Sequence, residues 1–169
     1  MDTTAMDTTA IQPAVHDLRG PRAIFWAGLI AGTLDLTGAC AVAWLKAGVT
    51  PLRIFQTVAS GLLGPASFTG GAKTAVLGLV LHLFIATTWA AVYYLASRRL
   101  SFLIDQTIIA GMLYGVLVWL FMNFVVLPMS AVIKRPVPLS ARIIGMLIII
   151  CGIGLPIAFV IRRFSKQSV

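Results

Sequence analysis

The sequence is 169 residues long, with 59% hydrophobic and only 11% charged residues. A mean hydropathy of +0.98 excludes a water-soluble domain of this length, which needs more charge to cover its surface, and predicts a membrane protein. The net charge of +8 would suit a nucleic-acid partner, but nearly all thirteen Lys and Arg residues lie between or beside apolar runs. Basic residues in such places orient helices and contact anionic lipid, so we expect a bilayer with anionic head groups and no nucleic acid as partner.

The first 22 residues are polar and begin with the near-repeat MDTTAMDTTA. Such a segment has too few apolar residues to bury a core, so residues 1–22 are predicted to be a disordered N-terminal tail. The repeat leaves open whether Met1 or Met6 is the true start.

Four later runs reach the length of about 20 mostly apolar residues that a membrane-spanning helix needs. They cover residues 24–45, 75–96, 107–129 and 143–161. The predicted fold is all-α: a polytopic membrane protein with four transmembrane helices in one domain over residues 23–163. A basic C-terminal tail, residues 164–169, follows.

The connection between the first two runs contains a predicted amphipathic helix at residues 52–63. Polar Arg53, Gln56, Thr57 and Ser60 recur at helical spacing among apolar residues. Pro51 favours a helix start there. The segment is too short to cross a bilayer, so we expect it to lie in the interface or to re-enter between the spans.

An even number of spans places both chain ends on one side of the membrane. The basic residues divide almost equally, seven on the side of the termini and six on the other. The arginine pairs at residues 98–99 and 162–163 favour cytoplasmic termini.

Glycines recur at four-residue spacing in two of the runs. Gly28 and Gly32 form one such pair, and Gly111 and Gly115 form another. Small residues at this spacing allow helices to approach closely in lipid. They predict a compact bundle, and they are compatible with a homo-oligomer or a membrane-protein partner.

Three polar residues lie inside the apolar runs. Asp35 is the twelfth of the 22 residues of its run, close to the membrane midplane, where a charged side chain costs about 2.5–3.5 kcal/mol. His82 and Asn123 lie roughly one and two helical turns from the centres of their runs, toward the side of the 46–74 connection. We therefore expect a polar ladder of Asp35, His82 and Asn123, to which Thr37 and Thr87 add hydroxyl groups.

Two functions compete for this ladder. In the favoured one, a structural or accessory, self-associating bundle, Asp35 hydrogen-bonds His82 or a threonine and holds helices together. In the alternative, a small proton-linked transporter or channel, Asp35 and His82 are an intramembrane protonatable pair.

Other chemistry finds little support in the sequence. Ser/His/Asp, HExxH, Walker and dinucleotide motifs are absent, and the two cysteines and two histidines have no metal-ligand spacing. The sequence therefore predicts no enzyme, no metal site and no cofactor. A membrane enzyme acting on lipid is the weakest of the classes considered.

One further pattern combines several segments already described. It joins GTLDL at residues 32–36, SGLLG at 60–64, the turn Gly70–Gly71, His82, and Met122–Asn123. In these features residues 23–163 resemble a group of small, uncharacterised bacterial inner-membrane proteins. The resemblance implies four spans and a bacterial inner (cytoplasmic) membrane, and it supplies no activity.

Overall fold

The computed structural model describes residues 19–133 and 137–166, and all regular structure in this part of the chain is helical. Four helical segments are long and apolar enough to cross a membrane: Gly20–Ala47, Gly71–Ser97, Thr107–Met129 and Leu139–Ser165. The predicted all-α fold with four spans is therefore confirmed. The protein is a multi-pass integral membrane protein whose surroundings are a lipid bilayer.

The helices extend beyond most of the apolar runs. The first, α1 (Arg19–Ala47), includes the last residues of the expected polar tail. Its partner α3 covers Gly71–Ser97, and the last helix, α8 (Leu155–Lys166), continues into the expected C-terminal tail. Residues 1–18 and 167–169 lie outside the described residues, and so does the expected disorder of the N-terminal tail.

The predicted short helix is α2 (Pro51–Leu63), continued by the 3₁₀ turn η1 (Gly64–Phe68). It packs against the beginning of α3, and a polar part of its surface turns inward. Gln56 is buried and its Nε2 donates a hydrogen bond to the Gly71 carbonyl at 3.1 Å. Gly78 of α3 permits this contact, because a side chain there would collide with the backbone of Phe55.

Two of the spans are interrupted by π-helical turns, each ending just before a proline. The third span consists of α5 (Thr107–Phe121), η2 (Met122–Val126) and α6 (Leu127–Met129). The fourth consists of α7 (Leu139–Ile149), η3 (Ile150–Gly154) and α8. Pro128 and Pro156 lack an N–H group, so the α-helical bonding pattern cannot continue through them. The N–H groups of the preceding Leu127 and Leu155 bond five residues back, to the carbonyls of Met122 and Ile150.

The core is built from small residues that bring the helices close together. Ala23, Ala27 and Ala31 repeat at every fourth position of α1 and are almost fully buried. A methyl group added to Gly28 on this helix would lie 2.5 Å from the Thr87 Cα of α3, and one on Gly115 of α5 would lie 2.7 Å from the Ile150 Cα. Gly32 faces Ala86, and Gly111 faces Ala158. The four predicted packing glycines therefore face other helices of the same chain.

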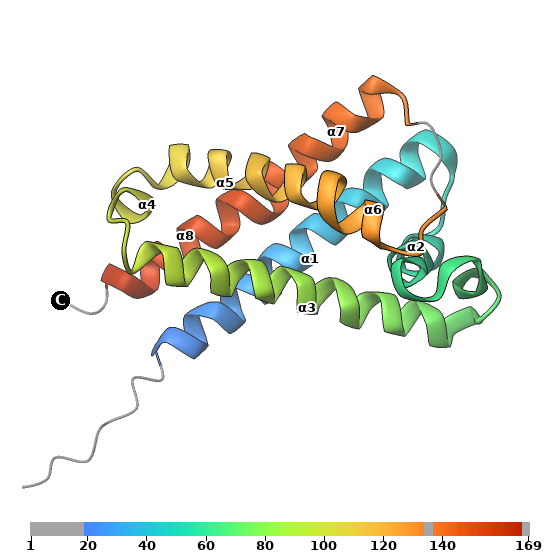
Figure 1. Cartoon of the computed structure of the whole chain (residues 1–169), viewed down its shortest axis with the longest axis horizontal. Helices are drawn as coiled ribbons and strands as arrows, with labels where there is room; N and C mark the ends of the chain where they lie inside the picture. The colour runs from blue at the N-terminus through green and yellow to red at the C-terminus, as the bar shows by residue number, and fades with distance from the viewer. Residues whose placement is uncertain (1–18, 134–136, 167–169) are drawn as a thin grey trace, which may run out of the picture.

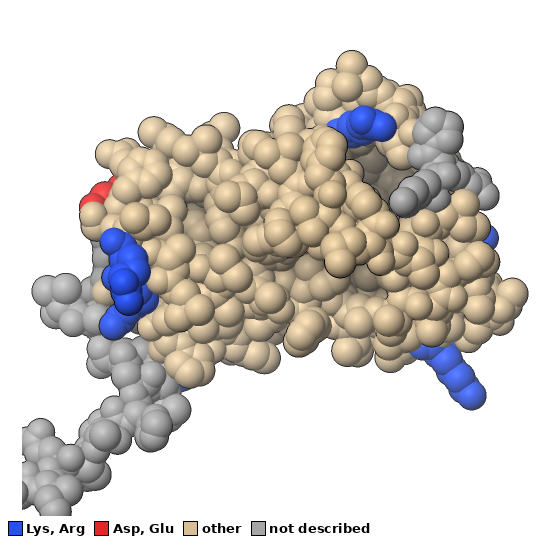
Figure 2. Space-filling model, viewed as in Figure 1, with Lys and Arg blue, Asp and Glu red and all other residues tan. Residues whose placement is uncertain are grey.

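α1 and α3 run along the length of the bundle and pack against each other, and α8 packs against both α1 and α5 (Figure 1). The start of α1 and the end of α8 lie at one end, together with the short helix α4 (Phe102–Asp105), while α2 lies at the other end. In Figure 2, the basic side chains lie toward the two ends of this face, and uncharged residues cover its middle. This distribution is the one expected of a bundle that crosses a bilayer.

The glycine packing of α1 on α3 can be tested with a matched pair of substitutions on one helix. We expect Gly28→Ala to lower the free energy of unfolding by about 1–3 kcal/mol, because the new methyl group meets the backbone of Thr87. Gly38→Ala should change it by less than about 0.5 kcal/mol, because its methyl group would lie 3.5 Å from Ile148 Cγ2, an ordinary contact. Denaturation in detergent micelles, followed by circular dichroism, measures both. Equal losses in the two variants would contradict this packing.

Candidate functional site

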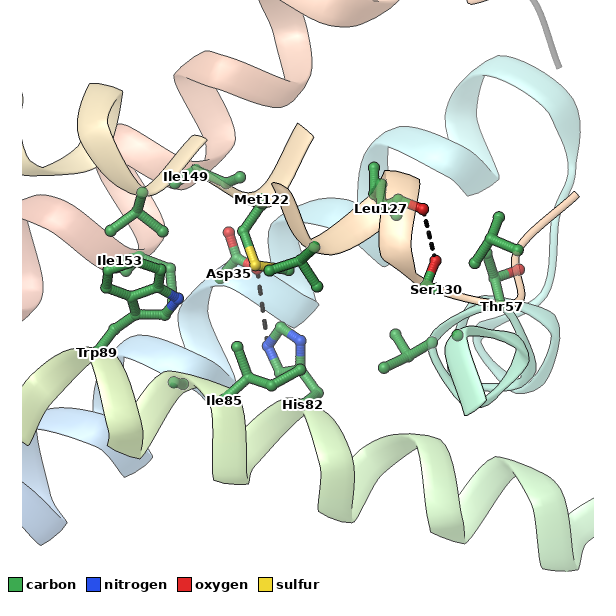
Figure 3. A pocket seen from close by; sticks show the side chains of 16 residues that line it. Asp35, Thr57, His82, Ile85, Trp89, Met122, Leu127, Ser130, Ile149 and Ile153 are labelled. Carbon is green, nitrogen blue, oxygen red and sulfur yellow. Dashed lines mark hydrogen bonds and ion pairs between the residues drawn. The ribbon is translucent and has the colours of Figure 1, made fainter. Parts of the chain in front are cut away.

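A cavity of about 290 Å³ lies between the spans, bounded by α1, α2, α3, the third span and the fourth span. Its walls are mostly apolar. Asp35 and His82 contribute the ionisable groups, while Thr57 and Ser130 contribute hydroxyl groups on the side of α2 (Figure 3). The larger apolar side chains of the wall are Ile85, Trp89, Met122, Ile149 and Ile153.

Asp35 and His82 meet at this cavity, although they are 47 positions apart in the sequence. The Oδ2 atom of Asp35 lies 3.6 Å from the Nε2 atom of His82. The same Nε2 atom is closer to the carbonyl oxygen of Gly32, at 3.0 Å. Because a carbonyl oxygen only accepts hydrogen bonds, Nε2 carries the proton and donates it to Gly32. The imidazole thus makes its shorter contact with the backbone of α1 and its longer contact with the carboxyl group.

The carboxyl group is held by backbone packing on two sides. On one side Gly32 allows α3 to approach α1, and on the other Gly152 of η3 lies directly against Asp35. A methyl group at Gly152 would be 2.6 Å from the Asp35 Cα. Asp35 is only 9% exposed, and its Oδ1 atom is buried without a hydrogen-bond partner among the described residues. A buried carboxyl oxygen in this condition is costly to the fold.

Both π-helical turns contribute to the cavity wall. Met122 and Val126 come from η2, and Ile153 comes from η3. Such turns occur frequently at functional sites, because they widen a helix locally and reorient its side chains. Pro128 and Pro156, which follow these turns, are the sequence signal for this part of the cavity wall.

The polar ladder expected from the sequence is only partly formed. Asn123 does not line the Asp35 cavity: its Nδ2 atom donates to the Trp119 carbonyl at 2.9 Å, and it faces a separate pocket near Arg142. The neighbouring Met122 lies on the cavity side of the helix instead.

The two threonines likewise do not join the cavity lining. Thr37 is exposed and donates to the Thr33 carbonyl of its own helix at 2.7 Å. Thr87 donates to the Leu83 carbonyl at 2.8 Å and packs against Gly28. Among the five expected site residues, the structure therefore brings Asp35 and His82 together.

Trp89, about two helical turns after His82 on α3, forms one wall of the cavity. Its ring is held edge-to-face by Phe121 and Tyr114, with centroids 5.3 and 6.0 Å away. The Tyr114 hydroxyl also donates a hydrogen bond to the Trp89 carbonyl at 2.6 Å. A rigid aromatic wall therefore faces the space beside the carboxyl group.

A loop contact lies beside the end of the cavity next to α2. The backbone N–H of Ala131 donates to the Gly61 carbonyl at 3.0 Å, which joins the chain after α6 to α2. Beside this contact, the hydroxyl groups of Thr57 and Ser130 donate to the carbonyls of Arg53 and Leu127. Their oxygen atoms remain able to accept a hydrogen bond.

The arrangement can hold a proton or accept a hydrogen bond, and it offers no clustered ligands for a metal. Within the described ranges no group of three or more His, Cys, Asp and Glu residues comes together. One carboxyl group, one imidazole and an apolar wall instead form a small binding site of ordinary composition.

A double-mutant cycle measures how strongly Asp35 and His82 stabilise each other. From Asp35→Asn, His82→Gln and the double variant, we expect a coupling of about 0.6 kcal/mol in the free energy of unfolding, the usual size for polar pairs between membrane helices. The 3.6 Å separation supports this modest value. The control cycle pairs His82→Gln with Asp105→Asn, whose carboxyl group is exposed on α4, and it should give no coupling. A coupling above about 1.7 kcal/mol would contradict this geometry and show that the pair is a main interaction holding α1 to α3.

The chain was also compared with known proteins. No protein-family model, no curated protein and no solved structure matches it.

Proposed function

We propose that this integral membrane protein is a small carrier or channel that receives a solute in the Asp35 cavity, with Asp35 and His82 as its protonatable pair. One observation carries the proposal: a buried carboxyl oxygen, without a hydrogen-bond partner in the described part of the chain, lies at the wall of an apolar cavity between the spans. Ionisable groups inside membrane bundles typically mark substrate or proton pathways, and they usually have a partner close by. Here that partner is the imidazole of His82.

The competing function is a structural or accessory bundle in which Asp35 serves to join helices. Two contacts argue against this role for the carboxyl group. His82 already joins α3 to α1 through its 3.0 Å hydrogen bond to the Gly32 carbonyl, which does not involve Asp35. The close glycine contacts hold the same two helices together independently. Burying Asp35 would thus lower the stability of the fold without being needed to join α1 to α3.

Self-association belongs to the same competing function, and the glycine contacts bear on it. Gly28, Gly32, Gly111 and Gly115 all pack inside one chain, so they are not available to a second copy. An oligomer or a membrane-protein partner would have to use the larger apolar side chains on the outside of the bundle. Those side chains also suit contact with lipid tails.

For the location, we propose a bacterial inner membrane with both termini in the cytoplasm. The resemblance described above supports the membrane, and the paired basic residues support the orientation. Arg98 and Arg99 follow α3, and Arg162 and Arg163 lie in the last turns of α8, at the same end of the bundle (Figure 1). Basic residues beside spans favour the cytoplasmic side.

Water access at position 35 separates the carrier from the structural bundle. We would build Asp35→Cys in a Cys40→Ser, Cys151→Ser background and treat intact membranes with a small water-soluble thiol reagent. We expect labelling from one side of the membrane, because a solute path must admit water to the carboxyl group. Labelling is measured by the mass increase of the purified protein.

The matched control is Ala31→Cys in the same background, one helical turn away and fully buried. It should react only after denaturation. Both variants are first checked for correct insertion and a single elution peak. If Cys at position 35 also reacts only after denaturation, the site is dry and the carrier proposal falls in favour of the structural bundle.

A further inference from the structure

We infer that the solute of this cavity is a lipophilic organic cation, with its charged head at Asp35 and its apolar body against Trp89 and the neighbouring isoleucines. The inference rests on the proposed function, because it names the chemical class of ligand for the same site. It follows from the charge at the cavity, the composition of the cavity wall and the size of the cavity.

Asp35 is the acidic group at the cavity wall. Asp35 is buried, and its Oδ1 atom has no hydrogen-bond partner in the described part of the chain. Among the described residues, those that line the cavity include no Lys or Arg. The remaining ionisable group is His82, whose Nε2 proton is already directed at the Gly32 carbonyl. A buried carboxylate whose neighbour is a neutral imidazole attracts a cation and repels an anion.

The wall next to the carboxyl group suits an organic cation better than a hydrated metal ion. Trp89 is the best aromatic side chain for binding a cation over its ring, and its position is fixed by Phe121 and Tyr114. Met122 lines the same cavity, and its thioether is a soft, polarisable contact. Ile85, Ile149 and Ile153 complete an apolar surface that would not replace the water shell of a small inorganic ion.

The size of the cavity limits the ligand. Its volume of about 290 Å³ is nearly twice that of an apolar cavity of about 150 Å³ that binds benzene. One aromatic ring with a small ammonium group therefore fits. At the α2 end, the hydroxyl oxygens of Thr57 and Ser130 remain able to accept hydrogen bonds, which favours the passage of a cation rather than an anion.

The test measures binding of two probes of equal shape to the full chain in lipid nanodiscs. Benzyltrimethylammonium carries a permanent positive charge, and neopentylbenzene is its uncharged carbon isostere. Equilibrium dialysis with radiolabelled probes, corrected with empty nanodiscs, gives the dissociation constants. We expect the wild type to prefer the cation, and Asp35→Asn to weaken cation binding about thirtyfold or more while leaving the isostere unchanged.

Asp105→Asn is the matched control, since it removes an exposed carboxyl group on α4 and should leave both probes unaffected. Trp89→Leu keeps the carboxyl group and serves as a second variant should Asp35→Asn fold poorly. This substitution should weaken binding of the cation about three- to tenfold more than binding of the isostere.

Equal binding of both probes to the wild type, unchanged in Asp35→Asn, would overturn the cation inference while leaving a solute-binding cavity in place. Absence of cation binding would overturn the inference as well. The thiol labelling at position 35 does not depend on ligand charge, so it decides separately whether the proposed function falls too.

Discussion

The structure depends on burying one carboxyl group inside a bundle that has little else polar to offer it. In water a carboxylate is solvated at no cost to the fold, but in a membrane the chain itself must supply the surroundings. Here the backbones of α3 and η3 are brought up to Asp35 by Gly32 and Gly152. The close packing of α1 therefore serves two purposes: it holds the spans together and it encloses the carboxyl group.

The same packing explains why the cavity persists between helices that otherwise fit closely. Small residues fill the contacts of α1 with α3 and of α5 with the fourth span. Larger side chains line the cavity that lies between these contacts. The two π turns lie at this point and widen both outer helices on their inner side. The cavity, the carboxyl group and the aromatic wall therefore lie in the same part of the bundle.

The spans and the short helix could be predicted from the sequence because each depends on local composition. Apolar length gives the spans, and the polar spacing around Gln56 gives α2. The pairing of Asp35 with His82 could also be anticipated from depth in the membrane. The position of Asn123 could not, because depth in the membrane does not specify which face of a helix a residue occupies, and Met122 faces the cavity in its place.

The π turn at η2 has a mechanical consequence. Neighbouring residues on a helix point about 100° apart, so one extra residue within a π turn shifts by one position the residues that share a face before and after the turn. Met122 faces the cavity, and Asn123 faces the pocket beside Arg142. Beyond the turn the cavity wall continues with Leu127, five positions after Met122 instead of four, so the third span takes in one more residue while the parts before and after the turn keep the same face toward the cavity.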